Sequence, residues 1–176
     1  RAAPVQVTFN PLGNSLGPSI SADGQRIAFY SSGNLTGGNA DNSFEIVVYD
    51  RASNSFTQVS NHPGGHMTGG NQVPQISADG QRVVFQSFQA GGGTAFFQTV
   101  LHDFGTGLST PLTPLSNFGE TNTLSGDGRT VAIATGNTGL RLYDVPGGTL
   151  GPVIAGNTFN NALSFVGILL ASEGLV

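Results

Sequence analysis

The sequence predicts an all-β protein, a β-propeller built from four-stranded antiparallel blades, and two observations support this prediction. The phrase SISADGQRIAFYSS at 19–32 returns as QISADGQRVVFQSF at 75–88 and, more loosely, as TLSGDGRTVAIATG at 123–136. Repeats of roughly 50 residues are typical of solenoids and propellers. The apolar residues of each copy alternate or run together over short stretches, which is a strand pattern and not a helical one.

Each repeat begins with a strand A, a tight turn and a strand B. Asp-Gly in the turn tolerates the left-handed backbone that a hairpin needs, so the turn glycines are expected to have positive φ. Strand B is apolar and includes Phe29 in the first repeat and Phe85 in the second, which we expect to pack between blades. The turn residues are Asp23–Gly24, Asp79–Gly80 and Asp127–Gly128.

A strand C and a strand D complete each repeat. Strand C ends in an aspartate, and a short turn leads into strand D. Four strands in about 50 residues match one propeller blade, which buries its faces only by stacking on its neighbours. The repeats are expected at approximately 16–60, 73–114 and 121–155, with a partial fourth repeat at 161–176.

Nine of the 16 charged residues recur at repeated positions, which indicates structural roles. A single active site needs only one copy of each residue, whereas turns and blade joints need one per blade. We expect the aspartates to cap their own turns and the arginines to pair with an acid of the neighbouring blade. The positions are the turn aspartates, the arginines that follow them (Arg26, Arg82 and Arg129), and the ends of strand C (Asp50, Asp103 and Asp144).

The composition excludes several classes of protein. The net charge is −4 and the six cations are all arginines without clustering, so nucleic acid is not expected as a partner. The absence of cysteine excludes disulfides, thiol nucleophiles and cysteine-ligated zinc. The longest apolar run, at 165–171, is too short to span a membrane as a helix.

The repeats resemble the TolB-like, WD-like β-propeller repeats of exported bacterial proteins. The resemblance rests on ISADGQRIAF at 20–29 and on SSGNLTGGNADNSFEIVVYDR at 31–51, and it covers most of the chain. It implies a propeller fold and a periplasmic or secreted location. The family includes scaffolds, ligand binders and propellers attached to enzymes, so the resemblance leaves the activity open.

Antiparallel strands place the long B–C and D–A loops at one end of every blade, and binding residues are most often found on such loops. These long loops are expected at 32–43, 60–73, 88–94 and 116–121. We therefore expect a binding face at this end, with His62, His66 and Asn71 as contact residues. His62 and His66 have the spacing of helical zinc ligands, but Pro63 and the glycines after it argue against a helix.

The loop NADNSFE supplies oxygen ligands that could hold calcium, although Asx turns explain the same residues. The candidate ligands are Asn39, Asp41, Asn42 and Glu45. No other cofactor is expected. His102 and Asp103 are adjacent on a strand, so their side chains should point to opposite faces and form no catalytic dyad.

We expect a non-enzymatic scaffold that binds a protein or a surface ligand. The alternatives are a propeller segment of a larger hydrolase or peptidase and a calcium-stabilised envelope or adhesive protein. VQVTF at 5–9 aligns with strand D, so it is expected to be the outer strand of a preceding blade. The chain should therefore form an open arc, part of a longer propeller.

Overall fold

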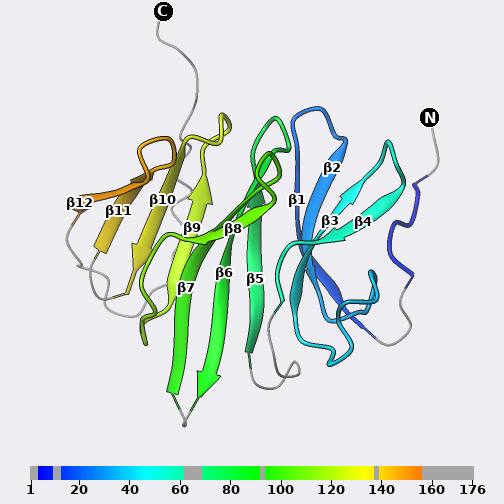
Figure 1. Ribbon diagram of the computed structural model, residues 1–176, viewed down its shortest axis with the longest axis horizontal. Coiled ribbons are helices and arrows are strands. Elements are labelled where there is room, and N and C mark those ends of the chain that lie inside the picture. Colours follow the sequence, from blue (N-terminus) through cyan, green and yellow to red (C-terminus); the bar gives the residue numbers. More distant parts are fainter. Residues whose placement is uncertain (1–3, 10–12, 62–68, 92–93, 137–138, 156–176) are drawn as a thin grey trace, which may run out of the picture.

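The computed structural model describes residues 4–9, 13–61, 69–91, 94–136 and 139–155. These residues form three four-stranded antiparallel sheets, and the strand order in each sheet follows the sequence. The sheets lie side by side, each beside its neighbour along the chain (Figure 1). The predicted all-β class and the four-stranded blades are thus confirmed.

The three sheets are named blades 1, 2 and 3. Blade 1 contains β1 (Ser15–Ile20), β2 (Arg26–Ser31), β3 (Glu45–Asp50) and β4 (Ser55–Gln58). Blade 2 contains β5 (Gly69–Ile76), β6 (Arg82–Gly91), β7 (Thr94–Asp103) and β8 (Leu108–Pro111). Blade 3 contains β9 (Glu120–Leu124), β10 (Thr130–Thr135), β11 (Gly139–Asp144) and β12 (Thr149–Ala155). Within the described part of the chain, no helix is long and apolar enough to cross a membrane.

The hydrophobic core lies between blades and not within any one of them. One cluster joins Ala28, Ile46 and Val48 of blade 1 to Val83 and Phe85 of blade 2. A second cluster joins the opposite face of blade 2 to blade 3, with Val84 and Leu101 meeting Val131 and Ile133. Successive strand residues point to opposite faces, so blade 2 buries apolar side chains on both.

Three expectations about the strands are wrong. Residues 4–9 do not form a strand, because a β-strand is held by hydrogen bonds to a neighbouring strand and no strand of the described residues pairs with them. Strand β5 begins at Gly69, inside the predicted loop 60–73. The predicted loop 88–94 consists mostly of hairpin, because β6 and β7 continue to its tip. The predicted partial repeat at 161–176 lies outside the described residues.

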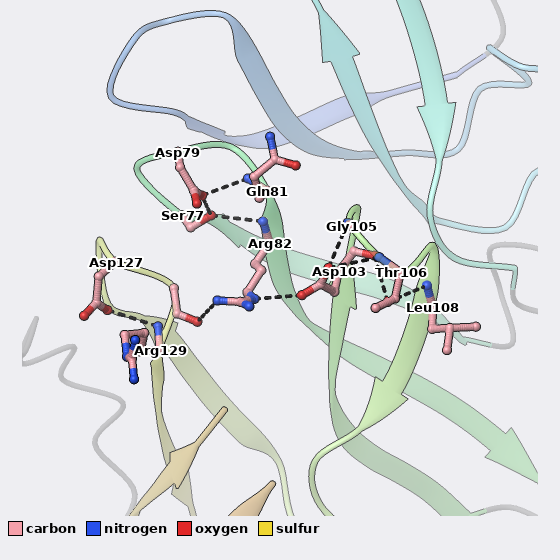
Figure 2. Close-up of polar contacts among 11 residues, drawn as sticks. Ser77, Asp79, Gln81, Arg82, Asp103, Gly105, Thr106, Leu108, Asp127 and Arg129 are labelled. Atoms are coloured by element: carbon pink, nitrogen blue, oxygen red, sulfur yellow. Dashed lines mark hydrogen bonds and ion pairs between the residues drawn. The ribbon is translucent and has the colours of Figure 1, made fainter. Parts of the chain in front are cut away.

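The three A–B turns share one hydrogen-bonding pattern, seen for blade 2 in Figure 2. Ser77 Oγ donates to Asp79 Oδ1 at 2.6 Å, and the same carboxylate oxygen accepts the Gln81 backbone N–H at 2.9 Å. Ser77 Oγ also accepts the Arg82 backbone N–H at 3.0 Å. The aspartates therefore cap their own turns, as expected. Gly24, Gly80 and Gly128 have the expected positive φ, between 68° and 70°.

The arginine after each of the first two turns joins its own blade to the next one. Arg26 Nε lies 3.2 Å from Asp50 Oδ2 in the same blade, and Arg26 Nη1 donates to the Gly80 carbonyl of blade 2 at 2.9 Å. Arg82 repeats this with Asp103 at 2.8 Å and the Gly128 carbonyl at 3.1 Å (Figure 2). The expectation of an acid in the neighbouring blade is wrong, because β2 pairs Arg26 directly with Asp50.

Arg129 does not occupy the position of the other two arginines. Ser125 Oγ accepts the backbone N–H of Thr130, which is therefore the residue equivalent to Arg82. The Arg129 N–H instead bonds to Asp127 Oδ1, as the glutamine does in the other turns. Strand pairing aligns Thr130 with Asp144, so the strand C aspartate of blade 3 faces a threonine.

Candidate binding face

The end of the molecule formed by the B–C and D–A connections is called the loop end, and the opposite end is called the turn end. At the loop end, the β6–β7 hairpin extends furthest, and it projects at the lower edge of Figure 1. Strands β6 and β7 contain 10 residues each, whereas β2 and β3 contain six. The two strands of this hairpin pair along their whole length, so their backbone holds the side chains at the loop end in fixed positions.

Aromatic residues gather on this hairpin. The rings of Phe88 and Phe97 lie 5.1 Å apart on one face of the hairpin. Phe96 is next to Phe97 in the strand and therefore points to the opposite face. Phe97 and Ser116 exchange backbone hydrogen bonds, which fasten the D–A connection to the hairpin. Leu115 and Phe118 flank this bridge and are 49% and 42% exposed. We call these four apolar residues the aromatic hairpin surface: Phe88, Phe97, Leu115 and Phe118.

Three of the four calcium candidates converge on one serine. The Ser43 hydroxyl lies 3.2 Å from Asn39 Oδ1, 3.0 Å from Asp41 Oδ1 and 2.7 Å from Glu45 Oε1. Asn42 is exposed and has a positive φ of 57°, which Asn tolerates in turns. The Ser43 backbone N–H also bonds to Asp41, which completes an Asx turn. The carboxylates are thus in contact with donors of the loop itself.

No cluster of three or more histidine, aspartate or glutamate residues that could hold a metal is present among the described residues. The Asx turn is formed at this loop, and a calcium site stays the alternative prediction.

Two buried carboxylates at the loop end were not expected to be related. Glu45, 1% exposed, accepts a hydrogen bond from the Ser60 hydroxyl, which itself accepts the Ile46 N–H. Glu120 likewise accepts from the Thr113 hydroxyl at 2.9 Å, and Thr113 Oγ1 accepts the Thr99 N–H. In blade 1 and in blade 2, a hydroxyl side chain that follows strand D therefore bonds both to the backbone of strand C and to a buried carboxylate.

These carboxylates come from different strands, which is why the repeat pattern did not reveal them. Glu45 opens strand C of blade 1, whereas Glu120 opens strand A of blade 3 and reaches back to blade 2. The recurring signal was a hydroxyl residue two positions after the end of strand D, Ser60 in one repeat and Thr113 in the next. Near Glu120, the buried amide of Asn122 has no hydrogen-bond partner in the described structure.

The predicted contact residues are only in part described. His62 and His66 lie outside the described residues. Asn71 belongs to β5 and pairs with Ser87 of β6, so it lies at the loop end of blade 2.

The His102–Asp103 pair is divided between two faces, as expected. Asp103 contacts Arg82, whereas His102 Nδ1 lies 3.0 Å from Ser109 Oγ. The Ser109 hydroxyl donates its one hydrogen to the Val59 carbonyl, so Nδ1 of His102 must carry the hydrogen of this contact. A histidine that activates a serine accepts the hydroxyl proton, and this pair has the opposite polarity.

The three stacked blades define the class of this protein, a β-propeller domain. Solved structures of propellers share its fold. TolB from Acinetobacter baumannii matches with a TM-score of 0.51 and 23% identity, over 80% of this chain and 31% of that one. The β-propeller domain of the trilobed protease from Pyrococcus furiosus matches with a TM-score of 0.55 and 16% identity, over 81% and 43%.

An oligogalacturonate lyase from Vibrio parahaemolyticus is also similar, with a TM-score of 0.58 and 13% identity, over 84% of this chain and 42% of the lyase. The chain thus spans less than half the length of each of these three proteins. No family model and no curated protein matches the sequence. These likenesses show the fold and the structural similarity to TolB-like and other propellers, and they carry no further assignment.

Proposed function

We propose that this chain is part of a non-enzymatic β-propeller scaffold that binds a protein partner through the loop end, outside the cytoplasm. The observation that carries the proposal is the aromatic hairpin surface. Aromatic side chains are enriched where proteins bind one another, because they bury a large area and lose little conformational entropy on binding.

The surroundings of this surface suit an apolar contact. No residue from Phe85 to Leu101 is charged, so docking a partner there leaves no unpaired charge buried. Phe97 is held at the bridge to Ser116 by two backbone hydrogen bonds, at 2.6 and 3.0 Å. A contact surface fixed before binding has less entropy to lose, which favours affinity.

A photo-crosslinking residue placed at position 118 tests this proposal in an extract of the source organism. Leu108, which is 64% exposed at the turn end, is the matched control position. We expect a discrete cross-linked protein from position 118, lost in the Phe88→Ala variant, and none from position 108. Equal labelling from both positions, or labelling that Phe88→Ala leaves unchanged, would contradict the proposal.

Location is tested separately by cell fractionation. The exported type of repeat supports a periplasmic or secreted protein, and recovery in the cytoplasmic fraction would count against it.

The second candidate is a propeller segment of a larger peptidase that positions or gates the substrate. It is favoured by the match to the propeller of the trilobed protease, which this chain covers to 43%. The open reading frame on both sides of the chain distinguishes the two candidates, since an adjoining hydrolase domain would support the second.

A further inference from the structure

The side-chain amide of Asn122 is buried in the joint between blades 2 and 3. Among the described residues, only Asn122 has buried side-chain nitrogen and oxygen atoms without a hydrogen-bond partner, and it is 6% exposed. It lies in β9 between Glu120 and Leu124, and alternate residues of a strand point to the same face. Glu120 bonds to Thr99 of blade 2, and Leu124 packs against the cluster shared by blades 2 and 3. The amide therefore points into this joint.

The Glu120 carboxylate lies two residues away on the same face of β9 and is 4% exposed. The hydroxyls of Thr99 and Thr113 both donate to its Oε2, at 2.7 and 2.9 Å. The described residues give no hydrogen bond to Oε1, and their salt bridges do not include Glu120. A carboxylate held away from bulk water is stable there only when it is paired or hydrogen-bonded. Oε1 therefore needs a donor, as Asn122 Oδ1 does.

The equivalent place in the joint between blades 1 and 2 is apolar. Ile46 is the counterpart of Thr99, because the N–H of each bonds to the hydroxyl that follows strand D of its blade. The strand A position of the unpaired amide is occupied there by Pro74, which is fully buried at a bulge opposite Phe85. The amide of blade 3 instead stands opposite Ile133, a smaller side chain. The joint between blades 2 and 3 is therefore more polar at this place, and its side chains take up less volume.

Water suits these groups better than a cation does. Buried waters typically make about three hydrogen bonds to polar groups that would otherwise be unpaired. Asn122 Nδ2 needs an acceptor, whereas Asn122 Oδ1 and Glu120 Oε1 need donors. A water molecule both accepts and donates hydrogen bonds. A cation bound to the two oxygens would leave the Nδ2 hydrogens without a partner.

We propose that the joint between blades 2 and 3 holds ordered internal water, which accepts a hydrogen bond from Asn122 Nδ2 and donates to Asn122 Oδ1 and Glu120 Oε1. The water completes the hydrogen bonding of an amide from blade 3 and of a carboxylate that already reaches Thr99 of blade 2. It joins the two blades near the loop end, whereas Arg82 joins the same two blades at the turn end through the Gly128 carbonyl.

NOE and ROE spectra between water and the isotope-labelled full chain test this site. We expect the side-chain amide protons of Asn122 to show cross-peaks to water whose NOE and ROE have opposite signs, which is the signature of long-lived bound water. Asn39 is the matched control, because it is 2% exposed but its Nδ2 donates to the Ser43 carbonyl at 2.8 Å. Asn39 Oδ1 also lies 3.2 Å from the Ser43 hydroxyl, so the control includes any transfer through an exchanging hydroxyl proton.

A second measurement separates water from a cation. We expect the midpoint of urea unfolding to be the same in sodium, potassium and choline chloride at equal ionic strength. A higher midpoint in sodium or potassium chloride, lost in the Asn122→Leu variant, would assign the site to a cation and overturn the proposal. Circular dichroism shows whether this variant is folded.

The proposal is also overturned if the Asn122 amide protons show no such cross-peaks, or cross-peaks no stronger than those of Asn39. This comparison uses the unaltered protein, so it holds even if Asn122→Leu does not fold.

Discussion

Arg26 of blade 1 donates to the carbonyl oxygen of Gly80 in blade 2 at 2.9 Å, across 54 residues of sequence. The guanidinium is held from the other side by Asp50 and rests over the ring of Phe104, 4.8 Å from its centre. One side chain therefore ties the end of strand C in one blade to the A–B turn of the next.

The joint leaves little space for a side chain at Gly80. Its φ is 69°, and a Cβ there would lie 3.1 Å from Arg26 Cδ. Gly107 is the control, because its φ is 71° but nothing lies within 4 Å of its Cβ position. Gly107→Ala should destabilise the protein by about 1 kcal/mol through backbone strain alone, and Gly80→Ala by about 2–3 kcal/mol. Equal losses in urea unfolding would show that the close contact with Arg26 is unimportant.

Of the two strand B phenylalanines, Phe85 is expected to contribute more to the free energy of unfolding. It is 2% exposed within the cluster that joins blades 1 and 2, so Phe85→Ala should cost about 3–5 kcal/mol. Phe29 is also buried, but its ring contact is with Phe56 of its own blade. Phe29 belongs to neither of the two clusters between the described blades, so Phe29→Ala removes no contact across those joints and should cost less. A loss below about 1 kcal/mol for Phe85→Ala would contradict the assigned face.

Acidification should weaken the joint between blades 1 and 2 through His102. Burial lowers the pKa of the His102 side chain below its usual 6.5, and Asp103 has a smaller opposing effect. The His102 ring packs against Phe104, and the Arg26 guanidinium of the joint lies over the ring of Phe104. The unfolded chain then binds the proton more readily than the folded one. Stability is complete above about pH 6.5 and is lost as the pH falls toward the lowered pKa.

The measurement is the unfolding free energy between pH 7.5 and 5, compared with the His102→Gln variant. If the unfolding free energy of His102→Gln falls with pH as steeply as that of the original protein, a group other than His102 causes the loss.

The calcium candidates are tested by thermal melting with calcium and with a chelator. Because the Ser43 backbone N–H bonds to Asp41 and the Ser43 hydroxyl lies 2.7 Å from Glu45 Oε1, both carboxylates have donors within the loop, and we expect the two melting curves to coincide. Calcium-dependent stabilisation that Asp41→Asn abolishes would instead establish a calcium site. Ser53→Ala, outside the cluster, is the control for this variant.

Much of the fold was predictable because its signals are local. An Asp-Gly turn flanked by apolar strands specifies a hairpin through the backbone conformations it allows, wherever it occurs in a chain. Strands A therefore end at Ile20, Ile76 and Leu124, as expected. Residues 5–9 have the composition of a strand, but the pairing that makes a strand is not local, and they do not form one.

The candidate binding face was predicted only as an end of the molecule. Loop length indicated the loop end, but 88–94 turned out to be mostly hairpin, because β6 and β7 pair as far as Gly91 and Thr94. The aromatic hairpin surface follows from that register, which brings Phe88 beside Phe97. Register between strands depends on the whole sheet and was not visible in the spacing of the residues.

The sequence by itself determined the repeat, the four strands of each blade and the capped turns, since these depend on residues a few positions apart. Only the tertiary structure decided the partners of the charged residues. Arg26 finds Asp50 and the Gly80 carbonyl, Thr130 takes the place expected for Arg129, and Glu120 reaches Thr99 in the preceding blade. Such contacts depend on how one blade is seated on the next, because a long side chain can reach partners on either blade and packing between the sheets selects one of them.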